Sequence, residues 1–244
     1  MLSPFTEVSR AIWDQFQDQA TSNGSTWTKQ TTDYWNEAST DADGMLGGFG
    51  NLSGIDIAHS LSFLRRHPPT MGLNSVNSVI DVGSGIGRIT KSVLLPVFRN
   101  AKISLLEPSL RFLEHSKTLL SSVPERIADR FCLGFQSVSQ IGSLIYDVYF
   151  LEWVLLYLND DEVVESLEFC QSHLSKGGCI VIKENVTFDG GLSFDEDDNS
   201  VTRPCSYFEE LFTAAGLSVV ARESVPNWPK ELFEVICWKL EPCS

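Results

Sequence analysis

The residues best suited to binding a small ligand form a glycine-rich turn after the first apolar strand expected in the chain. The turn reads Asp81-Val82-Gly83-Ser84-Gly85-Ile86-Gly87-Arg88 and leads from that strand into a helix. Its GxGxG spacing lets a ligand lie directly against the backbone. A dinucleotide site instead has GxGxxG, with a pyrophosphate at the helix N-terminus. The spacing therefore favours a ligand without phosphates.

Polar side chains near the ends of neighbouring strands indicate what this ligand contains. Glu107 ends the second expected strand and is placed to accept both ribose hydroxyls of an adenosine. Gln136 follows the third strand as a candidate contact for adenine, and Arg88 suits the carboxylate of a methionine group. These features favour S-adenosylmethionine, although Glu107 alone suits any adenosine ligand. The alternative is an ordinary strand–helix turn with polar surface residues.

Further polar residues lie at the ends of the fourth and fifth expected strands. Glu152-Trp153 follows one and Glu184-Asn185 the other, so both pairs should face the same crevice. The segment 194–200 then places four acidic residues in a row. Such a run is usually a solvated loop, and the alternative is a rim that binds a cation.

The elements that position these residues alternate between apolar strands and helical patterns. This alternation predicts a doubly wound α/β fold with a mostly parallel, seven-stranded sheet. The last two strands have no helix between them, so one should be antiparallel. We expect strands at 76–82, 102–106, 131–133, 146–151, 179–183, 217–222 and 232–240, and helices at 8–16, 55–66, 89–98, 110–120, 160–174 and 207–215, with a turn at 176–178.

Length and charge limit the possible partners. The 244 residues suit one α/β domain, and the net charge of −14 disfavours nucleic acid but attracts a cationic substrate. The alternative is that the acidity only maintains solubility.

We expect no membrane span and no secretory signal in this sequence. We also expect no metal, because the cysteines and histidines lack the spacing of metal ligands. We expect a cytoplasmic location, with the nucleus left open as a second compartment. The sequence does not specify the oligomeric state.

Several segments together resemble the protein α-N-terminal methyltransferases. These enzymes methylate the free amino terminus of proteins that begin Xaa-Pro-Lys after methionine removal. The resemblance extends from about Tyr34 to the C-terminus. It rests on Tyr34-Trp35, Asp43-Gly44-Met45-Leu46-Gly47-Gly48, the stretch from Asp81 to Lys91, Glu152-Trp153-Val154, Val181-Ile182-Lys183-Glu184-Asn185 and the loop 195–200.

The resemblance implies a class I, Rossmann-like methyltransferase fold over residues 61–244, with residues 1–60 as a helical extension and lid. It implies S-adenosylmethionine as the methyl donor, S-adenosylhomocysteine as the product and Xaa-Pro-Lys tails as partners. The residues implied to bind the cofactor are Gly83, Gly85, Arg88, Glu107, Gln136 and Glu152.

The same resemblance implies two groups of residues on the acceptor side. Asn185 and Asp198 would manage the proton of the amine. The residues implied to bind the peptide are Trp35, Leu46 and Trp153 along a channel, and Asp195, Asp198 and Ser200 around the lysine of the third position.

Three positions depart from the family pattern. Glu152 replaces an expected glutamine, Tyr157 a histidine and Phe49 a tyrosine, which leaves the finer substrate preference open. Two other functions remain as alternatives: a methyltransferase for a small-molecule amine, and a non-catalytic adaptor with a methyltransferase-like fold. A nucleotide-dependent oxidoreductase is disfavoured by the GxGxG spacing.

Overall fold

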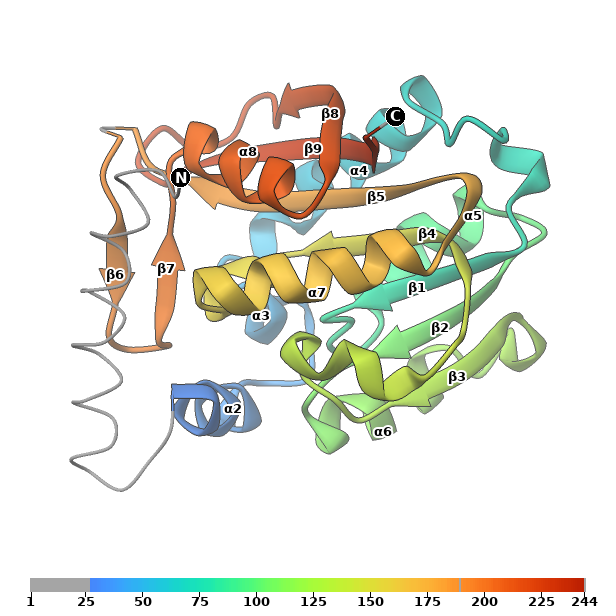
Figure 1. Cartoon of the computed structure of the whole chain (residues 1–244). Coiled ribbons are helices and arrows are strands. Elements are labelled where there is room, and N and C mark those ends of the chain that lie inside the picture. The colour runs from blue at the N-terminus through green and yellow to red at the C-terminus, as the bar shows by residue number, and fades with distance from the viewer. Residues whose placement is uncertain (1–26, 189, 244) are drawn as a thin grey trace.

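The computed structural model of the chain describes residues 27–188 and 190–243, so the helix expected over residues 8–16 lies outside the described part. Its centre is a seven-stranded sheet with the strand order β3-β2-β1-β4-β5-β9-β8 (Figure 1). Strand β9 is antiparallel to both of its neighbours, and the other pairs are parallel, which confirms the predicted fold class. The strands are β1 (Ser78–Val82), β2 (Lys102–Leu106), β3 (Ile127–Phe131), β4 (Tyr146–Glu152), β5 (Leu174–Val186), β8 (Leu217–Ser224) and β9 (Glu234–Pro242).

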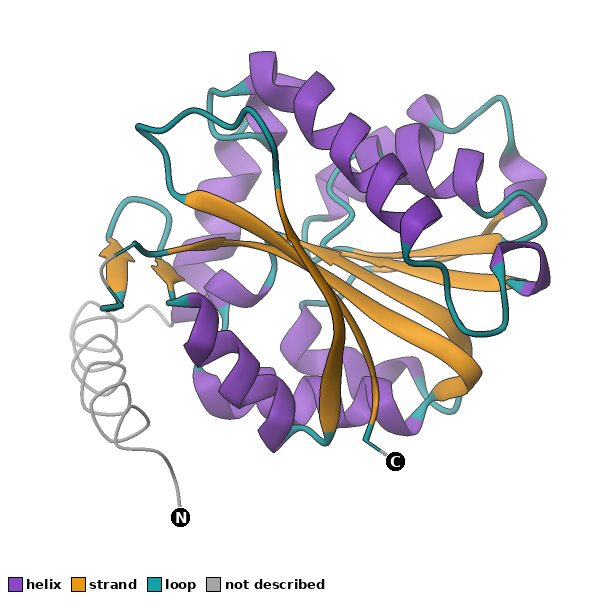
Figure 2. Cartoon of the chain, turned by 90° about the horizontal axis from the view of Figure 1, so that it is seen from above, coloured by secondary structure: helices purple, strands orange, loops and turns teal. Residues whose placement is uncertain are grey.

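Helices cover both faces of the sheet (Figure 2). The central strands are mostly apolar because alternate side chains point to opposite faces of the sheet, and both faces are buried. Ile80 and Val82 pack under α7 and α8, whereas Val79 packs on the other face with residues of α4 and α6. The helices are α2 (Trp27–Glu37), α3 (Ala42–Met45), α4 (Ser53–Arg66), α5 (Leu95–Val97), α6 (Leu110–Leu119), α7 (Asp160–Ser172) and α8 (Cys205–Ala214), with a short 3₁₀ helix η6 (Leu155–Tyr157).

Parallel pairing brings the functional residues to one edge of the sheet. In register, Val82 of β1 lies beside Leu106 of β2 and Leu151 of β4, and Glu152 lies beside Lys183 of β5. The residues that follow these positions therefore meet at the carboxyl ends of four adjacent strands. This is the edge at which open α/β sheets bind ligands.

Some elements differ from the sequence-based expectation. The third strand lies earlier than predicted, because it is an edge strand with exposed polar residues and lacks a continuous apolar signal. The turn expected at 176–178 is an irregularity inside β5, where the pairing register with β4 shifts. A two-stranded hairpin of β6 (Ser193–Asp195) and β7 (Ser200–Thr202) was not expected.

The N-terminal part of the described chain is helical, as expected. The predicted boundary at residue 60 falls inside α4, and the division of the chain there stays a prediction. Buried Phe63 and Leu64 of α4 belong to the main core. Among the described residues, no helix is long and apolar enough to cross a membrane.

Candidate active site

Two adjoining cavities lie at the carboxyl edge of the sheet and share a wall of Trp35, Met45, Trp153 and Tyr157. The structure brings together every residue that the sequence assigned to each ligand. The first cavity is lined by all six predicted cofactor residues: Gly83, Gly85, Arg88, Glu107, Gln136 and Glu152. The second is lined by all predicted peptide and catalytic residues: Trp35, Leu46, Trp153, Asn185, Asp195, Asp198 and Ser200.

The glycine-rich turn gives the first cavity a wall of bare backbone. Gly83 and Gly85 have φ values of +66° and +53°, a region that residues with a side chain rarely adopt. A Cβ at Gly83 would lie 2.5 Å from a methyl of Val154, and one at Gly85 would lie 2.7 Å from the sulfur of Met45. Both glycines are therefore required by conformation and by space.

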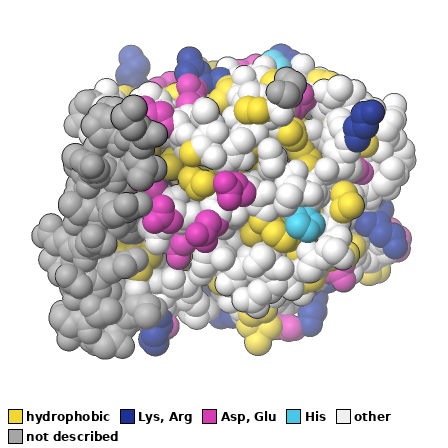
Figure 3. Space-filling view, in the orientation of Figure 1, with side chains coloured by type: hydrophobic (Ala, Val, Ile, Leu, Met, Phe, Trp, Pro, Cys, Tyr) yellow, Lys and Arg dark blue, Asp and Glu magenta, His cyan; other side chains and the backbone are white. Residues whose placement is uncertain are grey.

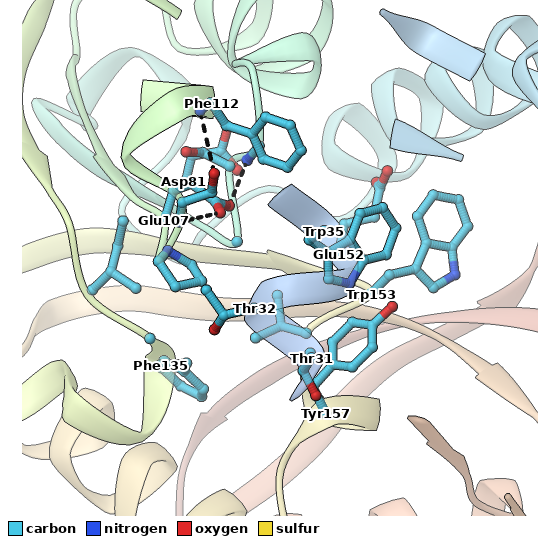
Figure 4. Close-up of a pocket in the computed structure, with 18 of the residues that line it drawn as sticks. Thr31, Thr32, Trp35, Asp81, Glu107, Phe112, Phe135, Glu152, Trp153 and Tyr157 are labelled. Atoms are coloured by element: carbon cyan, nitrogen blue, oxygen red, sulfur yellow. Dashed lines mark hydrogen bonds between the residues drawn. The ribbon is translucent and has the colours of Figure 1, made fainter. Parts of the chain in front are cut away.

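Glu107 lines the first cavity beside the glycine-rich turn and is only 6% exposed. Its carboxylate accepts the N–H of Gly85 at 2.9 Å and the N–H of Ser109 at 2.8 Å, which fixes its orientation (Figure 4). Burial raises the pKa of Glu107 to about 7, and the two N–H groups oppose this shift. A carboxylate with two oxygens retains further lone pairs for a ligand's hydroxyls.

Arg88 is fixed between two carboxylates. It donates to Asp56 of α4 at 2.6 Å and to Glu152 at 2.8 Å. Lys183 lies behind these groups, fully buried, and also contacts Asp56. Two cations and two carboxylates thus form one network beneath the first cavity. The departure at Glu152 therefore supplies a partner for Arg88, and burial raises the pKa of Glu152.

Trp153 lies between the two cavities in an unusual conformation with φ = +55°. Three consecutive residues of β5 fix it there. The carbonyl of Lys183 accepts the Trp153 N–H at 2.9 Å, and the Asn185 side chain accepts the indole N–H at 3.1 Å. Buried Glu184 accepts the next two backbone N–H groups at 2.7 and 2.6 Å. Strain at a bulky residue persists only where its surroundings impose it, and it is frequent at functional sites.

Asn185 and Asp198 approach the second cavity from different elements. Asn185 is near the end of β5, and Asp198 lies in the loop that joins β6 to β7. The hydroxyl of Tyr157 donates to Asp198 at 3.1 Å. Burial raises the pKa of Asp198, as does the charge of Asp195, whereas hydrogen bonds from Ser200 and Tyr157 lower it.

The acidic loop borders the outer part of the second cavity. On the face that shows α7, acidic side chains lie over this helix, while Lys and Arg side chains lie toward the periphery (Figure 3). Asp195 and Asp197 are exposed and line the cavity, so a cationic side chain there would meet two carboxylates. The loop is therefore part of the cavity wall, which favours the cation-binding alternative.

The structure adds residues that the sequence did not assign. Helix α2 contributes Thr28, Thr31 and Thr32 to the wall of the first cavity. Figure 4 shows Thr31 and Thr32 together with Trp35 of the same helix. The second cavity gains aromatic and aliphatic residues from three separate segments: Tyr34, Phe49, Trp228, Leu232 and Phe233. Large apolar residues inside polar segments were the only signal for these positions.

Comparison with known proteins gives consistent matches over most of the chain. A family model described as AdoMet-dependent proline di-methyltransferase matches residues 23–241. The N-terminal Xaa-Pro-Lys N-methyltransferase 1 of Danio rerio is 38% identical over 203 residues, covering 83% of this chain and 89% of that protein. The Homo sapiens protein of the same name is 36% identical over 211 residues, covering 85% and 92%.

A solved structure agrees with these sequence matches. It is a SAM-dependent methyltransferase from Leishmania major, with a TM-score of 0.80 and 28% identity over 89% of this chain and 84% of that one. The matches confirm the predicted family, the class I fold and the requirement for S-adenosylmethionine. This chain therefore belongs to the family of AdoMet-dependent proline dimethyltransferases.

Proposed function

We propose that the chain methylates the free α-amino group of proteins that begin Xaa-Pro-Lys, with S-adenosylmethionine as the methyl donor. One observation supports this most directly: two cavities, one suited to an adenosyl ligand and one to a cationic peptide, meet at Trp35, Met45, Trp153 and Tyr157. Donor and acceptor would react across this shared wall. Holding two reactants in such a geometry supplies much of the rate enhancement in transfer reactions.

The residues of the first cavity fit S-adenosylmethionine. A bare glycine backbone, a buried carboxylate at Glu107 and the guanidinium of Arg88 provide surfaces for the sulfonium, ribose and methionine groups. Phe112 and Phe135 line the same cavity and offer apolar contact to adenine (Figure 4). When bound, this donor supplies an electrophilic methyl group.

The acceptor nitrogen must be neutral to attack. A model α-amino group has a pKa of about 7.7–8.0, and lysine has one of about 10.4. Neutralising them at pH 7 therefore costs roughly 1 and roughly 4.6 kcal/mol, at 1.36 kcal/mol per pKa unit. An α-amine thus needs only moderate help from the protein, which favours it as the methylated group.

Asn185 and Asp198 can provide this help in different ways. The neutral amide oxygen of Asn185 accepts the Trp153 indole N–H and has a second lone pair for an N–H of the amine. Asp198 would accept the proton directly or through water. A carboxylate beside an ammonium also raises the ammonium pKa, so an orienting group without charge is useful.

The remaining groups recognise the peptide. A proline in the second position suits the indole face of Trp153, because both surfaces are rigid and apolar. A lysine in the third position would meet Asp195 and Asp198. The overall negative charge of the chain also attracts basic tails.

The activity can be tested with labelled S-adenosylmethionine and a panel of hexapeptides. We expect label on the α-amine of Xaa-Pro-Lys peptides, located by fragmentation in a mass spectrometer. An acetylated amino terminus should abolish the incorporation. Label on the lysine side chain, or equal incorporation into small amines, would refute the proposed substrate.

The lysine of the third position should contribute measurably to binding. We expect Xaa-Pro-Lys to bind about 1 kcal/mol more tightly than Xaa-Pro-Gln, roughly fivefold in Kd, because its ion pair with the acidic loop is partly exposed. Titration calorimetry in the presence of S-adenosylhomocysteine measures this difference. Asp195→Asn should reduce it, and equal affinities for the two peptides with the unaltered protein would contradict the assignment.

Cofactor affinity should depend on the ionisation of Glu107. Its pKa of about 7 lies above the usual value, so the carboxyl is mostly protonated at pH 6 and mostly ionised at pH 8. The ionised fraction rises from about one tenth to about nine tenths, and affinity for S-adenosylhomocysteine should rise close to tenfold. Calorimetry at the two pH values tests this. Glu107→Gln should remove most of this change, and any remainder would come from Asp81 or Glu152, which line the same cavity and whose pKa values burial also raises. An undiminished pH dependence in this variant would exclude Glu107 as its source.

A further inference from the structure

Tyr157 occupies a position between the donor and acceptor sides that no motif assigned to it. It lies at the end of η6 and lines both cavities. Helix α2 contacts it twice: the Trp27 indole donates to the Tyr157 carbonyl at 3.0 Å, and the Trp35 ring lies edge-on at 6.0 Å. The ring is therefore fixed by packing before any ligand binds.

Its hydroxyl connects this fixed position to the acidic loop. It donates to Oδ2 of Asp198 at 3.1 Å, across 41 residues of sequence. Asp198 lies in the short loop of a two-stranded hairpin, next to Asn199 with φ = +56°. A hydrogen bond to a half-buried phenol that packs against α2 is thus a means of orienting a carboxylate that belongs to a surface hairpin.

The charges around Asp198 explain why such a bond is needed. Four groups face Asp198: Asp195 and Asp197 from the same hairpin, Tyr34 from α2 and Tyr157 from η6. Glu184 of β5 in turn faces Tyr157. Burial raises the pKa of Tyr157 well above its usual range, so the phenol keeps its proton and acts only as a donor. Its hydrogen bond lowers the pKa of Asp198, which burial and Asp195 raise.

We propose that Tyr157 is a positioning residue: its hydroxyl orients Asp198 and favours the ionised carboxylate that receives the proton of the amine. This rests on the proposed function, since the amine proton is the one that Asp198 would accept. Tyr157 itself exchanges no proton in this scheme. One oxygen of Asp198 accepts from the phenol, and the other is left to act as the base.

The decisive experiment is a double-mutant cycle of Tyr157→Phe with Asp198→Asn, measured as kcat and kcat/KM on a Xaa-Pro-Lys hexapeptide over pH 4–9, in which the acidic limb that Asp198→Asn abolishes is assigned to Asp198. Tyr157→Phe alone should lower kcat about 10- to 100-fold, the usual range for a hydrogen bond to a charged group. The acidic limb of its pH profile should move to higher pH, because the anion of Asp198 loses a stabilising donor. In the Asp198→Asn background the same change should have little effect.

Controls separate this role from a structural one. Tyr149→Phe removes a hydroxyl of the same kind from the buried core and should leave kcat and the pH profile unchanged. If the Tyr157→Phe variant does not fold, a protein with 3-fluorotyrosine at position 157 can be measured in its place. Its phenol is more acidic and a stronger donor, so the acidic limb of the pH profile should move to lower pH. Equal fold-losses in both backgrounds, or an unmoved limb, would overturn the proposal. Failure of the unaltered protein to methylate any Xaa-Pro-Lys peptide would instead overturn the proposed function.

Discussion

Replacing Asp198 by asparagine is expected to lower kcat on a Xaa-Pro-Lys hexapeptide by about 10²- to 10⁴-fold, the range for loss of a general base. The amide keeps the size of the side chain but cannot accept a proton at neutral pH. The loss should shrink at high pH, where the α-ammonium loses its proton without help and the amine is neutral. Steady-state kinetics over pH 6–10 measure both effects, with S-adenosylhomocysteine binding as a check that the first cavity is intact.

The acidic loop offers a matched control for this prediction. Glu196→Gln removes one negative charge from the same loop, at an exposed residue adjacent to the Asp195 and Asp197 that line the second cavity. Its effect on kcat should be less than about twofold, since an exposed charge acts weakly through solvent. If the Glu196 variant lost as much activity as the Asp198 variant, the overall charge of the loop would be responsible. If both Asp198→Asn and Asn185→Ala retained the unaltered rate, neither residue would handle the proton.

The parts of this site that are local in sequence could be predicted from it. The strands before Gly83 and Glu107, and the strand that ends at Glu152, are short and mostly apolar, and their ends mark where ligands bind in an open α/β sheet. The DGMLGG segment and the glycine spacing then identified the family. The residues assigned to the cofactor line one cavity, and those assigned to the peptide and the amine proton line the adjoining one.

The parts that depend on distant contacts could not be predicted. Tyr157 bonds to Asp198 across 41 residues, and no motif indicates this contact, although the sequence shows that Tyr157 replaces an expected histidine. Glu184 was seen only as a polar residue at a strand end, although it fixes the backbone after Trp153 from the neighbouring strand. Such roles follow from the register between strands, which no spacing in the sequence specifies.

The Lys183-Glu184-Asn185 segment shows that a motif proposed to act in catalysis can also be structural. Successive side chains of a strand alternate between faces, so Lys183 and Asn185 lie on one face of β5 and Glu184 on the other. Lys183 points into the network with Asp56, and Asn185 reaches the second cavity. All three residues nevertheless contact Trp153 or the backbone after it. A change in any of them should therefore affect both stability and the shape of the shared wall.

Substitution of Lys183 by methionine is expected to lower the free energy of unfolding by about 3–5 kcal/mol, the range for breaking a buried ion pair. The ammonium is fully buried, contacts Asp56 and donates to Ser60 at 2.9 Å, and it lies 3.8 Å from Glu152. Methionine fills a similar volume but leaves Arg88 as the remaining partner of two buried carboxylates. Urea unfolding followed by tryptophan fluorescence measures the change.

The same substitution on the surface isolates the effect of burial. Lys117 pairs with Glu114 at 2.6 Å, and both side chains are 56% exposed, so Lys117→Met should change the free energy of unfolding by less than about 1 kcal/mol. Adding Asp56→Asn to Lys183→Met should restore part of the lost stability, because it removes a buried charge that has lost a partner. A Lys183 variant as stable as the Lys117 variant would mean that Arg88 alone balances both carboxylates. The network would then serve to orient Arg88 in the first cavity more than to stabilise the fold.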